Sequence, residues 1–327
     1  MADLKKEIVV MRCALSCLAA LFIGGVCFAQ SEKPLLLREP SVSRTQIVFS
    51  YADDLWIVSR DGGDAKRLTS GIGTEIDPVF SPDGTLVAFT GEYDGNRDVY
   101  VVPAAGGVPQ RLTYHPGSDE VVGWTRDGKS VLFRSGRNSY SFGFHRLFTI
   151  PLTGGLASEV PLPRAEQGSY SADGSHMAYV PVMQWQKAWK RYRGGQTKRI
   201  WIVNLSDSRV EEEIPRDNSN DFNPIWVNDE VWFLSDLNGT VGLFAYECKT
   251  KQVRRVVRGN SFDLKSAGAG PDAIVYEEFG SIHLVDLKSG QDKRIDIRIA
   301  GDLPEVRQHF QKIEAKRVGL AAGLRFR

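Results

Sequence analysis

A six-fold internal repeat constrains the fold more than any other feature of this 327-residue sequence. Each copy holds an alternating apolar strand, then a polar turn, then a strand of basic and apolar residues. The copies centre on Asp54–Val58, Asp98–Val102, Arg146–Ile150, Arg199–Val203, Gly242–Tyr246 and Ser281–Val285. They start roughly 40 to 50 residues apart, which is the period of β-propeller blades. The sequence therefore predicts an all-β fold, a six-bladed β-propeller of four-stranded antiparallel blades over residues 34–298.

The second repeat indicates how one blade forms. Asp77–Phe80 is expected as the inner strand, and Ser81–Gly84 (Ser-Pro-Asp-Gly) as the turn that follows it. Proline fixes the first corner of such a turn, and glycine tolerates positive φ at its end. Thr85–Thr90 should then be the second strand, apolar along its length because both of its faces are covered. Similar turns are expected at Arg126–Gly128 and Ala172–Gly174.

The ends of the repeat region are less regular. A first inner strand is expected at Leu35–Leu37, and the two ends show no obvious sign of exchanging strands within one blade. Two stacked β-sandwiches are the alternative architecture, but they do not account for the regular repeat. Residues 299–327 are expected to form a C-terminal tail, interpreted as a truncated linker.

The first thirty residues have the pattern of a secretory signal peptide. Lys5, Lys6 and Arg12 precede the apolar run Cys13–Phe28, and small residues stand before a cleavage site after Ala29. Residues 1–29 are therefore predicted to be a signal peptide, either from Met1 or from a start at Met11, and the mature protein to be periplasmic. An uncleaved membrane anchor is disfavoured because the run is short for a spanning helix. If the signal is not used, the protein is expected in the cytoplasm.

Charge and cysteine content exclude several classes of function. Lys and Arg number 41 against 40 Asp and Glu, giving a formal charge of +1, and no basic stripe is interleaved with aromatic residues. Nucleic acid is therefore not an expected partner. Once the signal peptide is removed, Cys248 is the single cysteine of the sequence, so neither a disulfide framework nor a cysteine-based zinc site can form.

The motifs of common catalytic sites are missing from the sequence. It has no Gly-x-Ser-x-Gly elbow, no His-Glu-x-x-His pair and no Gly-rich phosphate loop. His283 alternates inside an apolar strand, where a packing role is expected. A Ser-His-Asp triad assembled from separate blades is the alternative that sequence leaves open, because triads are defined by geometry. We predict no catalytic residue, no metal site and no cofactor.

Several segments resemble a known family. They are Tyr114–Pro116, Gly123–Lys129, Val131–Ser135, Arg146–Gly155, Gly91–Asn96, Gly270–Tyr276 and above all Trp189–Gln196 (Trp-Lys-Arg-Tyr-Arg-Gly-Gly-Gln). Together they are similar to the N-terminal six-bladed propeller of tricorn-type serine proteases. The Ser-Pro-Asp-Gly turns are less specific, since TolB-like and prolyl-oligopeptidase propellers share them. The resemblance covers residues 34 to about 305.

The resemblance implies a role in proteolysis. Tricorn-type proteases carry two consecutive propellers, a PDZ-like domain and a catalytic region, and the later parts have no counterpart in this sequence. The implied function is a propeller module for peptide channelling and scaffolding that is inactive alone. Its expected partners are peptides and a peptidase catalytic region, and the family implies a homo-oligomer. The alternative is a TolB-like periplasmic propeller that binds an envelope protein.

Two groups of residues are candidates for peptide binding. The insertion from Trp185 to Arg199 contains Trp189, Arg191 and Arg193, and such residues offer stacking area and bidentate contacts to carboxylates. Arg134 and Arg137 follow the second strand of the third repeat. In the family this propeller is proposed to line a path for departing peptides, so the resemblance implies contacts from these arginines to peptide C-termini. The alternative for each is an ordinary surface loop or turn.

Overall fold

The computed structural model describes residues 35–140, 143–183, 192–214, 218–237, 239–259 and 262–300, and all regular elements within these ranges are β-strands. The predicted signal peptide (1–29) and residues 301–327 of the predicted tail lie outside them. No helix in this part of the chain has the length and apolarity needed to cross a membrane. The strands form six sheets, as the repeat predicts.

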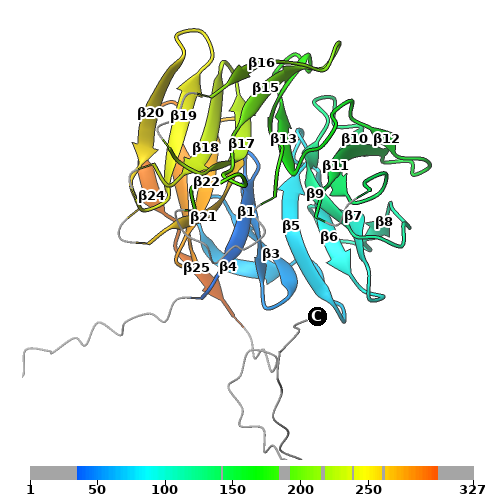
Figure 1. The fold of residues 1–327 in the computed structure, drawn as a ribbon. Coiled ribbons are helices and arrows are strands. Elements are labelled where there is room, and N and C mark those ends of the chain that lie inside the picture. The colour runs from blue at the N-terminus through cyan, green and yellow to red at the C-terminus, as the bar shows by residue number, and fades with distance from the viewer. Residues whose placement is uncertain are drawn as a thin grey trace, which may run out of the picture. The chain divides into compact units, whose positions relative to one another are not determined.

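Each sheet is an antiparallel blade whose strands follow one another in sequence (Figure 1). The first blade comprises β1 (Arg38–Val42), β2 (Gln46–Tyr51), β3 (Asp54–Ser59) and β4 (Gly63–Arg67), and the second comprises β5 (Thr74–Phe80), β6 (Leu86–Glu92), β7 (Arg97–Pro103) and β8 (Gln110–Arg111). The third comprises β9 (Asp119–Trp124), β10 (Ser130–Ser135), β11 (Arg146–Pro151) and β12 (Ser158–Glu159).

The remaining three blades repeat this order. The fourth comprises β13 (Gln167–Tyr170), β14 (His176–Val180), β15 (Trp201–Asn204) and β16 (Arg209–Glu213), and the fifth comprises β17 (Asp221–Val227), β18 (Glu230–Ser235), β19 (Gly242–Glu247) and β20 (Gln252–Val257). The sixth comprises β21 (Leu264–Ala269), β22 (Ala273–Glu278), β23 (Ser281–Asp286) and β24 (Asp292–Arg294). The six repeat centres of the sequence all fall on the third strands of these blades.

The hydrophobic core is divided among the interfaces between blades. Six clusters of buried apolar residues occur, and each joins two neighbouring blades, including the sixth and the first. In β6, Val87 and Phe89 pack toward the first blade, whereas Ala88 packs toward the third. Successive side chains of a strand point to opposite faces, so a strand covered on both sides is apolar throughout. This explains the continuous apolar run predicted for this strand.

The inner strands β1, β5, β9, β13, β17 and β21 contact one another in a closed ring. The first of them differs from the sequence-based expectation, because it spans Arg38–Val42 and not Leu35–Leu37. Leu37 is buried in the cluster between the first and sixth blades, and its N–H bonds to the carbonyl oxygen of Gly280 at 3.0 Å. Leu35 and Leu37 therefore help to seal the ring and are not part of the blade.

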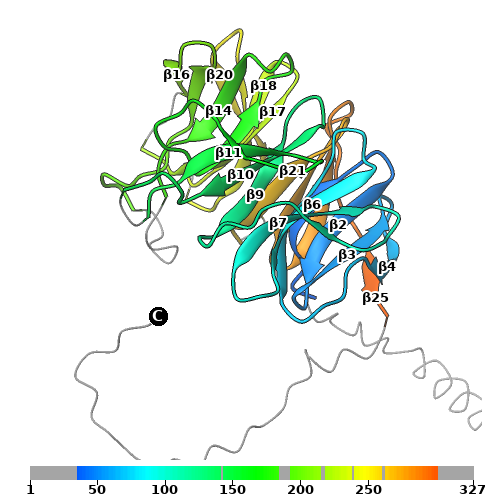
Figure 2. The ribbon, with the colours of Figure 1, turned by 90° about the vertical axis from the view of Figure 1, so that its right-hand side faces the viewer.

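The chain closes the ring with an additional strand. β25 (Ile297–Ile299) lies beside β4 in parallel and makes the first sheet five-stranded (Figures 1 and 2). Ile297 is buried in the same cluster as Ala65 and Trp56. The expectation that the two ends do not exchange strands within one blade is therefore wrong, because the C-terminal β25 joins the sheet of β1–β4. This strand ties the last blade to the first and ends at Ile299.

The alternating direction of the strands defines two faces of the ring. The inner strands begin at one face, which also carries the loops between second and third strands; we term it the long-loop face, and it includes residues 136–140, 143–145, 181–183 and 192–200. The inner strands end at the opposite face, which we term the short-turn face, and it includes residues 43–45, 81–85, 125–129 and 171–175.

Candidate functional site

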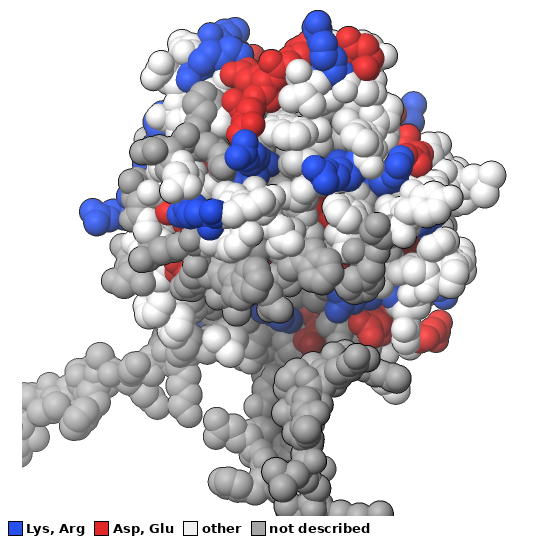
Figure 3. Space-filling model, in the orientation of Figure 1, with Lys and Arg blue, Asp and Glu red and all other residues white. Residues whose placement is uncertain are grey.

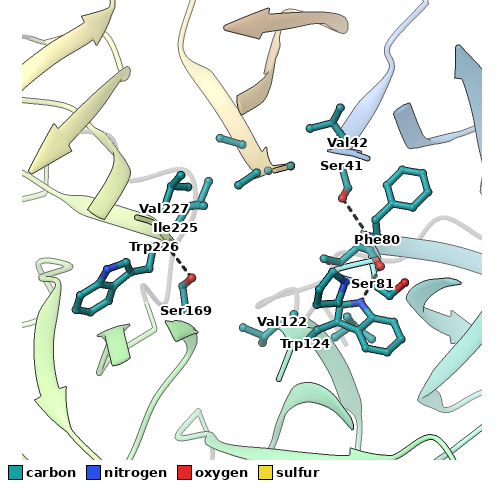
Figure 4. Close-up of a pocket in the computed structure, with 18 of the residues that line it drawn as sticks. Ser41, Val42, Phe80, Ser81, Val122, Trp124, Ser169, Ile225, Trp226 and Val227 are labelled. Carbon is teal, nitrogen blue, oxygen red and sulfur yellow. Dashed lines mark hydrogen bonds between the residues drawn. The ribbon is translucent and has the colours of Figure 1, made fainter. Parts of the chain in front are cut away.

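The main cavity lies on the axis of the ring. It has a volume of about 620 Å³ and is lined by residues of all six inner strands. Ser81–Gly84, Thr125 and Pro271 place its mouth at the short-turn face, and its lining is drawn from none of the described loops of the long-loop face. Val42, Phe80 and Ile225 border the cavity, but their side chains are buried in the clusters between blades (Figure 4). Near the mouth the lining also includes Asp83 and Arg126, so the blade arrangement creates a pocket with both polar and apolar groups.

The cavity wall is held together by side chains that bond to the backbone of the next blade (Figure 4). Ser41 Oγ accepts the N–H of Phe80 at 3.1 Å, and Ser169 Oγ accepts the N–H of Trp226 at 2.9 Å. The indole of Trp124 donates to the carbonyl oxygen of Val79 at 3.0 Å. Inner strands of neighbouring blades form no ladder with one another, so these bonds satisfy backbone groups that would otherwise face the cavity.

The turns at the mouth form as their residue types predict. Ser81 Oγ accepts the N–H of Leu86 at 3.0 Å and donates to Asp83 at 2.6 Å. Gly84 has a φ of +75°, the conformation that glycine permits at the end of such a turn. The turns at 125–130 and 171–176 repeat these bonds with Thr125 and Ser171. The rim of the cavity is therefore rigidly hydrogen-bonded.

A layer of polar side chains forms the deep part of the cavity, and sequence reasoning did not identify it as a unit. Glu39, Asp77 and Asn223 occupy equivalent places in β1, β5 and β17, each before a proline, and each has φ between +52° and +56°. The register shifts at these positions mark β-bulges. A bulge redirects a side chain and frees a backbone amide. Gln167 Oε1 accepts the N–H of Asn223 at 2.9 Å, and Glu39 Oε2 accepts that of Asp77 at 3.0 Å.

Arg134 is the basic group of this layer. Its Nε donates to Glu120 Oε2 at 2.8 Å, and Arg97 Nη1 donates to Glu120 Oε1 at 2.7 Å. Burial alone would raise the pKa of Glu120, but the two guanidinium groups outweigh it and lower this pKa to about 2. About 27% of the Arg134 side chain remains open, and Arg134 lines the cavity. Arg134, a predicted binding candidate, therefore reaches the axial cavity, but its guanidinium group already pairs with the Glu120 carboxylate.

Asp77 is the most perturbed titratable group of the layer. Burial raises its pKa to about 7; the nearby Glu39 carboxylate adds to the rise, and Arg134 opposes it. Glu277 accepts the N–H of Glu39 at 3.2 Å and closes this network across the seam between the sixth and first blades. Burial also raises the pKa of Glu277. Ionisation of Asp77 and Glu277 in the deep layer therefore costs free energy.

Two other binding candidates, Arg137 and Arg193, lie away from the cavity lining. Arg137 pairs with the buried Asp119, and its guanidinium lies over the rings of Phe133 and Phe148. Arg193 makes a bidentate pair with Asp236, with distances of 3.0 and 2.9 Å. Two-point pairing of this kind fixes both partners, so Arg193 anchors its end of the insertion. Trp189 and Arg191 lie outside the described residues. Peptide contact stays a prediction for all five.

Around His176, His283 and Cys248, the described residues do not assemble an activated nucleophile. His176 Nδ1 lies 2.7 Å from Ser175 Oγ and its Nε2 lies 3.1 Å from Glu211, but the Ser175 hydroxyl is also 2.7 Å from Asp173 Oδ2. A carboxylate accepts the hydroxyl proton, so the histidine is not positioned as its base. His283 stacks on Tyr276 at 4.9 Å, as a packing role requires. Burial raises the pKa of the Cys248 thiol to about 11.

Charges of both signs are interspersed on the surface. Figure 3 shows acidic and basic side chains side by side near the top of the view, where β16 and β20 lie. Arg209 pairs with Glu211 at 3.1 Å and Arg254 with Glu230 at 2.6 Å, so these charges neutralise one another locally. Within the described ranges, His, Cys, Asp and Glu form no group of three or more that could hold a metal.

Fold and cavity together define a β-propeller module with an axial pocket. Comparison with known proteins gives its family. Residues 34–291 match the family described as the tricorn protease N-terminal β-propeller domain. Tricorn protease homolog 1 of Streptomyces coelicolor is 34% identical over 278 residues, covering 83% of this chain and 26% of the relative. The chain belongs to the tricorn protease N-terminal propeller family, as the motifs predicted, and spans about a quarter of the length of that relative.

Three further comparisons extend this result. A putative tricorn-like protease N-terminal subunit of Sulfurisphaera tokodaii is 24% identical, covering 50% of this chain and 84% of the relative. The crystal structure of the tricorn protease matches with a TM-score of 0.73 and 22% identity, covering 83% of this chain and 27% of the other. TolB from Acinetobacter baumannii matches with a TM-score of 0.57 and 16% identity, covering 73% and 58%. The last two show the shared fold, and the TolB likeness is the more distant.

Proposed function

We propose that this chain is the peptide-channelling and scaffolding module of an exported tricorn-type peptidase and has no peptidase activity alone. The observation that carries the proposal is the axial cavity, which is lined by all six blades and combines apolar and polar groups. An extended peptide likewise combines apolar side chains with polar backbone groups. Hydrolysis would depend on a catalytic region supplied by another polypeptide or by a longer form of this chain.

The name of one relative supports a propeller module that is separate from the catalytic region. The Sulfurisphaera tokodaii relative bears the name of an N-terminal subunit and is covered by this chain over most of its own length. A propeller of this family is thus described there as a subunit of a protease. Export follows from the signal-like residues 1–29, and sequencing of the mature N-terminus tests it: cleavage leaves Gln30 first. A mature protein that retains Met1 or Met11 would contradict export with cleavage.

A cavity-filling variant tests peptide binding. Gly123 lines the cavity, and a Cβ at this position would meet no atom within 4 Å, so Gly123→Leu projects into open space. Short apolar peptides should alter the fluorescence of Trp124 and Trp226 in the cavity wall. We expect Gly123→Leu to weaken this binding at least tenfold, while purified wild-type chain leaves fluorogenic peptides uncleaved.

The control is Val108→Leu, because Val108 is 89% exposed and belongs neither to the cavity lining nor to the candidate insertion. Its peptide affinity should equal that of the wild type. Equal binding by both variants, or no binding by the wild type, would remove the channelling role. Turnover by the purified chain, together with labelling of this chain by a serine-directed probe, would contradict the inactive-module proposal.

A further inference from the structure

Exposed apolar side chains gather on one face of the ring. Ten large apolar residues of the described ranges are exposed, and seven of them belong to the long-loop face. Ile72 is 96% exposed and Tyr140 fully so, and Tyr114 and Phe144 add to this set. Single exposed apolar residues are normal on a surface, but their concentration on one face marks an interaction site.

Three of the seven form a contiguous cluster that links the start and end of the ring. Phe262 and Phe279 stack with their ring centroids 4.2 Å apart, although they are 47% and 52% exposed. Leu36, also exposed, contacts the turn at Gly280, where an added Cβ would lie within 2.5 Å of its Cα. We term Leu36, Phe262 and Phe279 the aromatic cluster.

Folding alone does not account for phenylalanine at position 279. Phe279 and Gly280 form the two-residue turn between β22 and β23, with φ of +46° and +72°. Asn-Gly is the sequence that this turn favours, because both residues have positive φ. A bulky aromatic residue held there, with half of its surface in solvent, costs stability and offers an apolar contact. Its place in the turn is therefore better explained by a partner.

The path of the chain indicates which partner. β25 runs parallel to β4, so the described chain leaves the propeller toward the long-loop face, and Leu35 enters at the same face. The Streptomyces coelicolor relative matches over only 26% of its length, and the matched family domain is N-terminal. In a chain of this topology, regions that follow the propeller start from the long-loop face, which carries the exposed apolar residues.

We propose that the long-loop face, centred on the aromatic cluster, is the docking surface for the tricorn-type polypeptide that carries the regions following this propeller in its relatives. This inference rests on the proposed function and adds the surface through which the partner binds. The contact is apolar and specific to one face, since on the opposite face exposed large apolar residues are limited, within the described ranges, to Val108 and Leu156.

Site-specific photo-crosslinking tests the surface. A benzophenone amino acid replaces Phe279 in one form of the full chain and Leu156 in another; both sites are exposed and lie on opposite faces. The forms are expressed in the source organism, irradiated, and their crosslinked peptides sequenced by mass spectrometry. We expect crosslinks from position 279 to a tricorn-type polypeptide, at least tenfold more abundant than those from position 156.

A second variant measures the contribution of the cluster. Phe279→Asn retains the turn, because asparagine suits its positive φ, and should reduce recovery of the co-purified peptidase at least tenfold with a thermal stability equal to or above that of the wild type. Leu156→Ser is the control and should leave recovery unchanged.

The outcomes separate this inference from the proposed function. If the peptidase co-purifies but crosslinks from position 156, or from neither position, the docking surface is wrong and the proposed function stands. Crosslinks from position 279 to a second copy of this chain or to an unrelated envelope protein also overturn it. If no tricorn-type polypeptide co-purifies with the wild-type chain, and no longer form of this chain carries a catalytic region, the proposed function itself fails.

Discussion

At the residue scale, Asp77 combines three features that are individually unfavourable. It has a φ of +54°, it precedes a proline, and its carboxylate is buried beside that of Glu39. A non-glycine residue in the left-handed region is uncommon, although Asp and Asn adopt it most readily. Asn223 occupies the equivalent place in β17 with a φ of +56°. The bulge therefore requires a short polar side chain, and the charge of Asp77 is an added cost.

The pH dependence of stability tests this cost. Because the pKa of Asp77 is raised to about 7 in the folded protein, the folded state holds a proton that the unfolded state releases at about pH 4. Its stabilising effect is complete below about pH 4 and is lost as the pH rises to about 7. Asp77→Asn cannot ionise, so we expect it to be more stable than the wild type at pH 8 by about 1 kcal/mol or more, with the difference vanishing near pH 4.

Denaturant unfolding at pH 4.5, 6 and 8 measures the difference. Asp61→Asn, at a site 90% exposed, is the control and should follow the wild-type profile. Parallel profiles for Asp77→Asn and the wild type would show that Asp77 does not hold a proton at neutral pH.

At the element scale, a salt bridge between the third strand and the outer strand recurs in four blades. In the first two blades an acidic residue opening the third strand pairs with an arginine of the outer strand: Asp54 with Arg67, and Asp98 with Arg111. In the third and fourth blades the charges are exchanged, as in the pair of Arg146 with Glu159 and the pair of Arg199 with Glu213. The salt bridge therefore has the same place in all four blades. Its acidic residue belongs to the third strand in the first two blades and to the outer strand in the other two.

In the second blade a threonine hydrogen-bonds to the acidic residue of this salt bridge and provides a test. Thr113 Oγ1 accepts the N–H of Val99 at 3.0 Å and donates to Asp98 at 3.1 Å, and all three residues are buried. Thr113→Val keeps the shape but leaves a buried amide and a carboxylate oxygen without this partner, which costs about 1–3 kcal/mol. Thr250→Val, in an exposed turn, should change stability by less than about 0.5 kcal/mol. Thermal unfolding compares the two variants, and equal effects would contradict a stabilising role for the Thr113 hydrogen bonds.

The elements also show how much the sequence could predict. The Ser-Pro-Asp-Gly turn and the third strands were predicted closely because their signals are local: proline and glycine fix dihedral angles, and apolar runs report burial. The deep polar layer was missed because Glu39, Asp77 and Asn223 come from different blades. An X-Pro pair also normally indicates an extended residue, whereas here it sits in a bulge with positive φ. A repeated acidic or amide residue before proline was the signal available.

Arg134 and Arg193 show a second limit of prediction from sequence, which concerns the partners of charged side chains. Their residue types suggested contacts to peptide carboxylates, but each is paired within the chain: Arg134 with Glu120 of the adjacent strand, and Arg193 with Asp236 of the next blade. Composition and spacing identify a charged side chain, whereas its partner depends on which strands and loops the fold brings together. Arg134 was expected after the second strand of the third repeat, but it lies within that strand, β10, directly opposite Glu120 of β9.

At the scale of the whole molecule, stability depends on closing the ring. Each blade buries its faces only against its neighbours, so an open seam exposes two apolar faces at once. The seam between the sixth and first blades is made by segments far apart in the chain, including β25 against β4. Gly63 donates its N–H to the carbonyl oxygen of Asp296 at 2.8 Å, at the point where β25 begins. This contact is where closure can be tested.

Two adjacent glycines provide a matched pair for that test. Gly62 and Gly63 both have positive φ, +92° and +105°, so alanine at either site carries backbone strain of about 1–2 kcal/mol. A Cβ at Gly62 would lie 2.4 Å from the carbonyl oxygen of Asp296, whereas a Cβ at Gly63 would meet no atom within 4 Å. We expect Gly62→Ala to cost about 1–3 kcal/mol more than Gly63→Ala, because it also displaces β25. Hydrogen exchange should show faster exchange at Ile297–Ile299 in Gly62→Ala alone. Equal destabilisation, with unchanged exchange in β25, would mean that the parallel strand does not contribute to closing the ring.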